Sequence, residues 1–336
     1  MKAVVMSAFG GPEVLHYTEI EKPTPAPDEV LVKNYYIGVG KPDFVMRSGI
    51  CPFLDRQPPG LVCGNECAGI VEAVGSNVTA FQPGMRVCVN SGLGYGSHAE
   101  YIAVPQKFVT RLPDGYPLKY GTQLLNYSVA WAMLNDVGRG QPGQSLYITG
   151  GAGGIGTAVI QTALLQGMTV CASARSDEKC DYIRSLGAQC VFNSTKVAEK
   201  DAILEFTKGR GVDLIFDQLA GPRFESQFDY LADFGTIVLY NWLDGSPEVD
   251  QLKTIIARSS HAQAVRSFSF HVYDDKPERR AYLQQICMER IMNGELVPRL
   301  YKDLPLSEAR YAHELLDGQK IMGKLVLHTA FTEEER

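Results

Sequence analysis

The segment from Leu146 to Gly156 constrains the fold of this chain more than any other stretch. It reads Leu-Tyr-Ile-Thr-Gly-Gly-Ala-Gly-Gly-Ile-Gly, an apolar strand that runs directly into a glycine-rich turn. The spacing G-x-G-x-x-G permits a tight turn, close approach of the backbone to a pyrophosphate, and close packing of the next helix. We therefore expect a dinucleotide to bind at the helix N-terminus. The residues expected to contact it there are Gly151, Ala152, Gly153, Gly154, Ile155 and Gly156.

Around this turn, the sequence predicts strands that alternate with helices. The expected strands are 145–149, 169–174, 190–192, 213–217, 235–240 and 266–272. The expected helices lie near 155–166, 177–186, 198–208, 223–232 and 250–259. Six strands with intervening helices are typical of a doubly wound parallel sheet.

The remainder of the chain follows a different pattern. From residue 1 to about 123, short apolar runs are separated by Gly and Pro turns, which predicts a mostly antiparallel β domain. Beyond 271, we expect a long helix at about 276–292, a second helix at 307–316, and a final strand that begins near Gly323. The fold class is therefore α/β, with a separate β domain.

Length and composition limit the number of domains and the classes of partner that we expect for this protein. A chain of 336 residues exceeds what one hydrophobic core usually supports, so two domains are expected. The net charge of -6 argues against nucleic acid as the main partner. Because the chain shows neither a membrane-length apolar run nor a signal-peptide core, we expect a cytoplasmic protein without a membrane partner. Its eight cysteines contain no C-x-x-C pair, which favours buried free thiols.

Two motifs stand at a characteristic separation: Gly64-Asn-Glu-Cys-Ala-Gly-Ile-Val-Glu-Ala-Val-Gly75 and Gly151-Ala-Gly-Gly-Ile-Gly156. With a β domain before them and a return segment after them, the chain resembles the medium-chain dehydrogenase/reductase superfamily. Within it, the chain resembles the zinc-free quinone oxidoreductase branch that includes zeta-crystallin. The resemblance extends from Met1 to the Gly323-Lys-Leu-Val-Leu segment.

The resemblance implies three parts of the chain. They are a GroES-like substrate domain at 1–125, a Rossmann NADP-binding domain at 126–270, and a return segment at 271–336 that completes the GroES-like domain. It also implies an active site in the cleft between the domains, a small electrophilic substrate, and a homodimer paired through the edge strand 266–272.

The residues at the superfamily's metal positions predict that zinc is absent. Zinc alcohol dehydrogenases of this superfamily need a Cys where this chain has Gly40 and a His where it has Asn65. Residues 124–128 supply no thiol near the third ligand position, and the four-cysteine structural lobe is missing. Three residual candidates do not complete a tetrahedral set: Cys63, Glu66 and Cys67. The histidines that show no paired spacing receive no role: His16, His98, His261, His313 and His328.

The expected absence of zinc bears on the reaction. Oxidising an unactivated alcohol requires a group that lowers its pKa, as zinc does. The alternative Tyr-x-x-x-Lys device is missing, because none of the 16 tyrosines is followed four positions later by lysine. Hydride transfer to a quinone or enone needs less help, since the substrate oxygen carries the charge and one hydrogen bond can finish the protonation. We therefore predict a zinc-independent reductase of quinones or other activated C=C bonds.

The end of the second expected strand indicates which nicotinamide cofactor is used. NAD sites place an acidic residue there, and this chain has none. Instead, Arg175 can fork onto a 2′-phosphate, Ser176 can donate a hydroxyl, and Lys179 aligns with a phosphate-contacting lysine of the family. The alternative is that Ser176 caps a helix and Lys179 is solvated. We expect NADP(H), with Ser128, which aligns with a carboxamide-binding threonine, and Tyr240 as further contacts.

The substrate end of the site departs from the family. The family has an Asn at the position of Gly40 and a Tyr at that of Val45, and neither residue here can donate a side-chain hydrogen bond. Lys41, Asp43 and Tyr127 are the candidate catalytic residues, with a surface lysine, a helix cap and a packed aromatic as the alternatives. Fewer donors favour quinones over plain enones, because an enolate needs an oxyanion partner more than a hydroquinone anion does.

Two other functions stay open at this stage. An enoyl-thioester reductase shares the cofactor but needs a long channel. A catalytically weak, NADPH-binding structural or regulatory protein of zeta-crystallin type is conceivable because the family Asn and Tyr are missing. The net charge gives no support to RNA binding.

Overall fold

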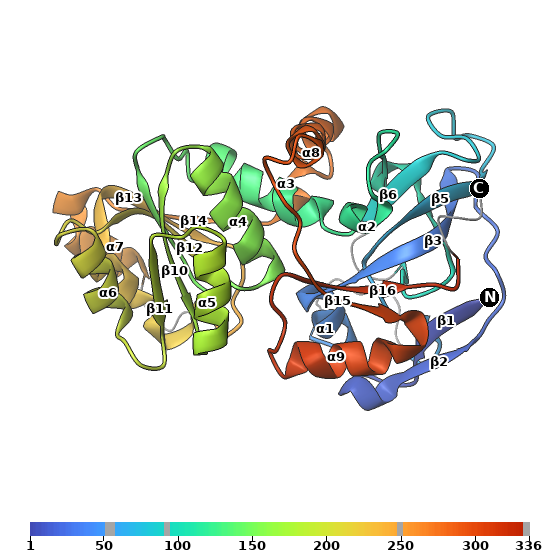
Figure 1. Cartoon of the computed structure of the whole chain (residues 1–336), viewed down its shortest axis with the longest axis horizontal. Coiled ribbons are helices and arrows are strands. Elements are labelled where there is room, and N and C mark those ends of the chain that lie inside the picture. The colour runs from blue at the N-terminus through green and yellow to red at the C-terminus, as the bar shows by residue number, and fades with distance from the viewer. Residues whose placement is uncertain (51–57, 91–94, 247–250, 332–336) are drawn as a thin grey trace. The chain divides into compact units, whose positions relative to one another are not determined.

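The protein is described here by a computed structural model that covers residues 1–50, 58–90, 95–246 and 251–331. The chain divides into two compact units. Unit 1 comprises Met1–Leu125 and Pro298–Arg336, and unit 2 comprises Asn126–Val297. Figure 1 shows this order by colour, with blue to blue-green and then red elements in unit 1, and green to orange-red elements in unit 2.

Unit 1 contains two sheets. Its small sheet has the order β2-β1-β4, from Leu15–Glu19, Lys2–Met6 and Leu61–Val62. Its large sheet has the order β15-β16-β3-β5-β6-β8, and β7 also pairs with β3. These strands are β3 (Glu29–Val39), β5 (Glu66–Val74), β6 (Arg86–Asn90), β7 (Tyr101–Pro105), β8 (Val109–Arg111), β15 (Leu300–Pro305) and β16 (Lys324–His328). The pairs are antiparallel except β15 with β16.

Two segments far apart in the sequence complete the core of unit 1. β16 pairs antiparallel with β3, and Leu325 lies opposite Val39, as the red and blue strands in Figure 1 show. The helix α9 (Ala309–Asp317) packs near α1 (Lys41–Arg47) and places Ala312 and Leu315 in the same buried cluster as the strands. Burying one such Leu or Val contributes about 1.5 to 3 kcal/mol, so the return segment is held mainly by its apolar face.

Unit 2 is a six-stranded parallel sheet with the order β11-β10-β9-β12-β13-β14. The strands are β9 (Ser145–Ile148), β10 (Thr169–Ala174), β11 (Cys190–Asn193), β12 (Val212–Asp217), β13 (Leu231–Leu239) and β14 (Ala264–Ser267). Its helices include α3 (Leu124–Ala132), which begins at the unit boundary, α4 (Gly154–Leu165), α5 (Asp177–Ser185), α6 (Glu199–Phe206), α7 (Gln251–Ala257) and α8 (Pro277–Met292). The strand order reverses at β9, as in a doubly wound sheet. The predicted fold class is confirmed.

Three sequence-based boundaries need correction. The expected return segment at 271–336 begins instead at Pro298, because α8 buries Leu283 and Cys287 within unit 2. The helix expected at 223–232 is replaced by short 3-10 turns, and β13 begins at Leu231, which pairs with Val212 of β12. Tertiary strand pairing therefore overrides the helical pattern there.

The expected edge strand 266–272 is also shorter than predicted. β14 ends at Ser267, and residues 270–273 form a 3-10 turn in which the Ser269 hydroxyl accepts a hydrogen bond from the His271 N–H (3.4 Å). A Ser side chain that bonds its own backbone in this way competes with a strand ladder. Pairing of two copies through this edge stays a prediction.

Two expectations from composition concern the cysteines and membrane spans. Among the described residues, six of the seven cysteines are buried, Cys190 is partly buried, and all seven are free thiols. Cys51 lies outside the described residues. Over the same residues, no helix combines the length and the apolar character needed to cross a membrane.

Asp213 joins the beginnings of two central strands of unit 2. Its Oδ2 atom accepts hydrogen bonds from the backbone N–H and the hydroxyl of Ser145 at the start of β9 (2.7 and 2.8 Å). The guanidinium of Arg210 donates to both carboxylate oxygens (2.7 and 2.8 Å). Partial burial raises the pKa of Asp213, but these donors outweigh it and lower the pKa to about 2.

Replacing Asp213 with Asn tests this link. A folded-state pKa below the unfolded value of about 3.9 stabilises the protein above pH 4, and the benefit is lost as the pH falls toward 2. D213N should lose about 1 to 2 kcal/mol of unfolding free energy at pH 7, a figure reduced for partial exposure, and much less at pH 3. Urea unfolding at both pH values measures this. D181N, which breaks the exposed pair with Arg184, is the control and should change little. Equal losses for both variants at pH 7 would contradict the account.

Candidate functional site

The glycine-rich turn connects β9 to α4 and leaves a helix N-terminus uncapped by any side chain. The N–H of Gly151 donates to the carbonyl of Ser173 in β10 (3.0 Å), and the N–H of Gly153 donates to the carbonyl of Gly150 (3.1 Å). Gly153 is the N-cap residue of α4 and supplies no side-chain acceptor. The first N–H groups of a helix have no intrahelical partner, so this end favours an anion.

Two glycines of the turn are required for different reasons. A Cβ atom at Gly156 would lie 2.6 Å from the carbonyl oxygen of Gly150 and 2.7 Å from the Cα of Gly151, so α4 could not pack this closely on the turn. A Cβ atom at Gly153 would meet nothing nearer than the Gly150 oxygen at 3.6 Å. The protein itself therefore leaves room at Gly153, which fits a ligand that approaches the backbone there.

Arg175 and Lys179 form a cationic pair just after β10. The hydroxyl of Ser176 accepts a hydrogen bond from the N–H of Lys179 (3.3 Å), so Ser176 does cap α5. Burial lowers the pKa of Lys179, and the positive charge of Arg175 lowers it further. The first turn of α5 holds two acids: Asp177 faces Asn193 and Lys196 (2.8 and 2.5 Å), and the charge of Glu178 acts to raise the pKa of Lys179. Two neighbouring cations at a helix N-terminus fit a phosphate group.

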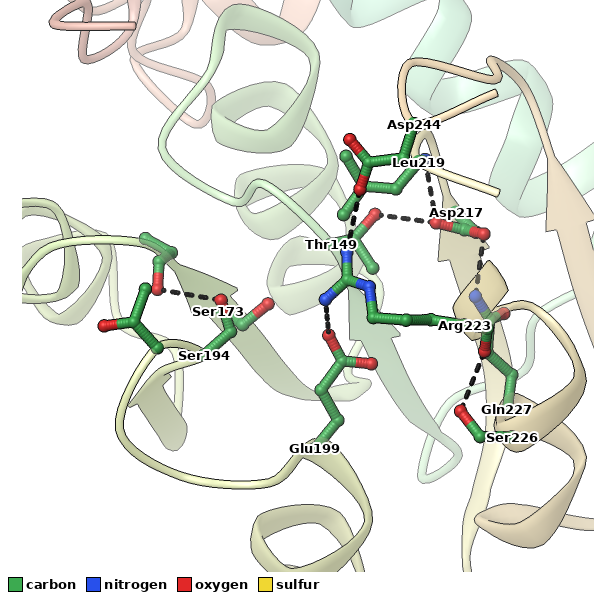
Figure 2. A network of polar contacts seen from close by, with 12 residues as sticks. Thr149, Ser173, Ser194, Glu199, Asp217, Leu219, Arg223, Ser226, Gln227 and Asp244 are labelled. Atoms are coloured by element: carbon green, nitrogen blue, oxygen red, sulfur yellow. Dashed lines mark hydrogen bonds and ion pairs between the residues drawn. The ribbon is translucent and has the colours of Figure 1, made fainter. Parts of the chain in front are cut away.

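Asp217, which the sequence analysis did not single out, organises the carboxyl end of the sheet. Figure 2 shows its carboxylate accepting hydrogen bonds from the hydroxyl of Thr149 (3.1 Å), the N–H of Leu219 (2.9 Å) and the side-chain amide of Gln227 (2.7 Å). Asp217 is fully buried, and these donors offset the free-energy cost of removing its carboxylate from water. An acidic residue that ends an apolar strand, Val-Asp-Leu-Ile-Phe-Asp, was the available sequence signal.

Arg223 forms a second set of polar contacts at the carboxyl end of the same sheet. Its guanidinium donates to Glu199 (3.0 Å) and to Asp244 (3.2 Å), as Figure 2 shows, and Glu199 also accepts from the hydroxyl of Tyr230 (2.8 Å). These contacts join the start of α6 to the segments that follow β12 and β13. In an open α/β sheet, ligands bind beyond the carboxyl ends of the strands.

Of three further predicted residues of unit 2, Tyr127 and Ser128 are buried, and Tyr240 is partly buried with its hydroxyl in the interior. Tyr240 follows β13, its N–H donates to the carbonyl of Asp217 (3.0 Å), and burial together with the Asp217 charge raises the pKa of its hydroxyl. Ser128 and Tyr127 are buried on α3. Burial raises the pKa of Cys287 to about 12, although a hydrogen bond with Ser128 acts in the opposite direction. The contacts of these residues with a cofactor stay predictions.

Lys41 and Asp43 lie on α1 in unit 1. The Oδ2 atom of Asp43 accepts a hydrogen bond from the N–H of Gly40 (2.7 Å), which is the helix-capping alternative. Burial raises the pKa of Asp43 to about 6, although the Gly40 N–H and the charge of Lys324 act in the opposite direction. The ammonium of Lys41 lies 3.6 Å from the ring centroid of Phe44, and partial burial lowers its pKa.

The residues at the superfamily's zinc-ligand positions do not fit a metal ion. A Cβ atom at Gly40 would lie 3.3 Å from the Nζ atom of Lys324 and 4.0 Å from the Oε1 atom of Glu66. Lys324 and Glu66 form a buried ion pair. A lysine ammonium therefore lies where a ligand side chain at position 40 would extend, and we derive no chemical step through zinc at this position.

Comparisons with known proteins agree with this fold. Residues 26–114 match the alcohol dehydrogenase GroES-like domain, and residues 154–287 match the zinc-binding dehydrogenase family. Human quinone oxidoreductase is 30% identical over 333 residues, with 97% of each chain covered. The structure of Escherichia coli quinone oxidoreductase complexed with NADPH is 25% identical, with a TM-score of 0.90 over 98% of this chain and all of that one.

A third similarity is to part of a larger enzyme. One subunit of the phenolphthiocerol/phthiocerol polyketide synthase of Mycobacterium tuberculosis is 29% identical over 322 residues. The match covers 94% of this chain but 14% of that protein.

The two glycines give a matched test of the turn. G156A should destabilise the ligand-free protein by about 2 kcal/mol, because the added methyl group overlaps the backbone of Gly150 and Gly151. G153A should cost less than about 1 kcal/mol, because its methyl group meets no protein atom closely. Urea unfolding without cofactor measures both values. A larger loss for G153A than for G156A would contradict the assignment.

Proposed function

Because the chain belongs to the medium-chain dehydrogenase/reductase superfamily, in its quinone oxidoreductase branch, we propose that it is a zinc-independent, NADPH-dependent reductase. Its proposed substrates are quinones and other activated C=C bonds. The observation that carries the cofactor choice is the pair of cations, Arg175 and Lys179, beside a strand end that lacks an acidic residue. When bound, NADPH supplies a hydride to an electron-poor carbon atom.

The residues that hold this cofactor follow from the geometry of unit 2. The uncapped N-terminus of α4 and the turn 151–156 would bind the pyrophosphate. Arg175 and Lys179 would neutralise the 2′-phosphate. Ser176 accepts a hydrogen bond from the Lys179 N–H, so its own O–H remains a donor for the same phosphate. Capping and phosphate binding are therefore compatible at this residue.

At the substrate end, the chain has to stabilise a developing oxyanion without zinc. Lys41 and Tyr127 are the proposed donors, and Asp43 acts by holding the first turn of α1, which includes Lys41. The lowered pKa of Lys41 makes its ammonium a better proton donor toward the substrate oxygen. A hydroquinone anion is intrinsically stable, so a site with few donors is better suited to quinones than to plain enones.

A second candidate function is reduction of an enoyl thioester. The polyketide synthase similarity favours it, because it spans 94% of this chain. The same cofactor residues would serve this reaction. The two candidates differ in the acceptor, which must be a thioester-linked alkene instead of a quinone.

The proposal is tested by following NADPH oxidation with a benzoquinone, a simple enone and an enoyl thioester, each with and without a metal chelator. We expect turnover of the benzoquinone, slower turnover of the enone, and no effect of chelator on either. Preferred turnover of the enoyl thioester would support the second candidate. Cofactor binding without reduction of any acceptor would overturn both and favour a non-catalytic, cofactor-binding protein.

Cofactor preference gives an independent test. With two charge-assisted hydrogen bonds of about 1.5 to 3 kcal/mol each to the 2′-phosphate, NADPH should bind about a hundredfold or more tighter than NADH. R175A and K179A should each weaken NADPH binding by about tenfold to a hundredfold and leave NADH binding nearly unchanged. Lys196, a neighbouring cation already paired with Asp177, provides the control variant K196A. If K196A weakens NADPH binding as much as R175A, the phosphate contact is wrongly assigned.

A further inference from the structure

The interior of unit 1 contains a cluster of metal-ligating side chains that hydride transfer does not use. The cluster consists of Cys63, which follows β4, His98, which precedes β7, and His313 on α9. The Sγ atom of Cys63 lies 4.0 Å from the Nε2 atom of His313, and the two imidazole centroids are 5.5 Å apart. One ligand atom from each residue lies within 4.8 Å of the other two. All three side chains are fully buried.

We propose that Cys63, His98 and His313 bind one zinc ion inside unit 1, with a structural role. One thiolate and two imidazoles form a borderline-soft donor set that suits Zn²⁺. The described Cys, His, Asp and Glu residues supply three of the four tetrahedral positions. Sequence spacing could not reveal this site, because the ligands come from three segments separated by 35 and 215 residues, the differences between 63 and 98 and between 98 and 313. It uses none of the superfamily's zinc positions and does not rest on the proposed function.

Backbone contacts hold two of the ligands in place. The N–H of His98 donates to the carbonyl of Cys63 (2.8 Å), the N–H of Cys63 donates to the carbonyl of Val4 (3.0 Å), and the N–H of Val4 donates to the carbonyl of His98 (2.8 Å). The side-chain amide of Asn34 also donates to the carbonyl of Ala99, next to His98 (2.9 Å). A first coordination shell fixed in this way loses little entropy when a metal binds.

The glycine next to Cys63 makes room for the imidazole of His98. Gly64 has a φ of +110°, which favours glycine, and a Cβ atom there would lie 2.2 Å from the Nδ1 atom of His98. The sequence therefore provides space for this ring directly beside the thiol. Any other residue at 64 would displace the ring.

The polar atoms of the cluster need partners that the described part of the chain does not supply. Both ring nitrogens of His98 and the Nδ1 atom of His313 are buried without a hydrogen-bond partner among the described residues. Buried polar groups are normally paired, and each unpaired one costs about 1 to 3 kcal/mol. Neutral imidazole is the form that binds a metal ion.

Buried charges of both signs surround the cluster: burial and the Asp43 charge raise the pKa of the Cys63 thiol, and the charge of Arg47 lowers it. Arg47 is paired with Asp317 (2.7 Å), and Lys324 is paired with Glu66. Asp43 is buried and forms no ion pair with any described residue, and its charge acts on the Cys63 thiol. When Zn²⁺ binds, the Cys63 thiol releases its proton to solvent and the thiolate bonds to the metal.

The position of the ligands indicates what the ion would do. His313 belongs to the return segment, and Cys63 and His98 belong to the first 125 residues of unit 1. A shared ion would therefore join two parts of the chain that are distant in sequence, and closing so long a loop stabilises a fold. The complete burial of the ligands leaves no access for a substrate.

The test uses the full chain, produced in minimal medium supplemented with either Zn²⁺ or Co²⁺. We expect one zinc ion per chain by mass spectrometry of the metal, and a thiolate-to-cobalt charge-transfer band in the near-ultraviolet spectrum of the cobalt form. The Tm should be higher for zinc-loaded than for metal-free protein. The rate of benzoquinone reduction should not depend on metal occupancy.

Paired cysteine variants locate the ion. C63S should lose the cobalt band and at least nine-tenths of the zinc, while C67S, an equally buried thiol of unit 1 outside the cluster, should keep both. Zinc retained by C63S, or a wild-type cobalt form without a thiolate band, would overturn the proposal. If C63S does not accumulate as folded protein, the wild-type cobalt spectrum decides alone, since its band requires a cysteine ligand.

Discussion

The close contact between the β9–α4 turn and the first turn of α4 is the constraint on which unit 2 depends. No side chain fits at Gly156, because the Gly150 carbonyl already lies where a Cβ atom would be. This contact brings α4 down onto the sheet and directs its free N–H groups beyond the carboxyl ends of the strands. The Asp217 carboxylate then fixes the following loop to Thr149 on the same edge. The proposed anion site is thus a consequence of packing.

The positions of charged side chains limit which ligands each unit can bind. In unit 2, burial and the charge of Arg175 lower the pKa of Lys179, and the proposed 2′-phosphate would offset the repulsion between the two cations. In unit 1, Lys324 lies beside the position where related dehydrogenases carry a zinc ligand, and Glu66 neutralises it. The proposed reaction therefore relies on hydrogen-bond donors such as Lys41 to receive negative charge. This suits acceptors whose reduced form is a stable anion.

The sequence predicted the parts of the fold whose patterns are local. The glycine spacing and the alternating strands located the doubly wound sheet, and Ser176 was recognised as a possible cap. The helix expected at 223–232 failed because pairing of Leu231 with Val212 outweighed a helical pattern. Asp217 was missed because its importance lies in donors from three separate segments. The pairing of His98 with His313 could not be predicted, since only the fold brings residues 215 positions apart into contact.

The most direct test of the account is single-turnover hydride transfer from NADPH to a benzoquinone, measured with deuterium at one or the other C4 position of the nicotinamide. We expect a slower reaction for one labelled position and an unchanged rate for the other, because the proposed site would present one face of the cofactor to the acceptor. Cofactor that binds but is not oxidised by the quinone would contradict it. Equal rates for both labelled forms and the unlabelled cofactor would also contradict it, since no carbon-hydrogen bond would then break in the measured step.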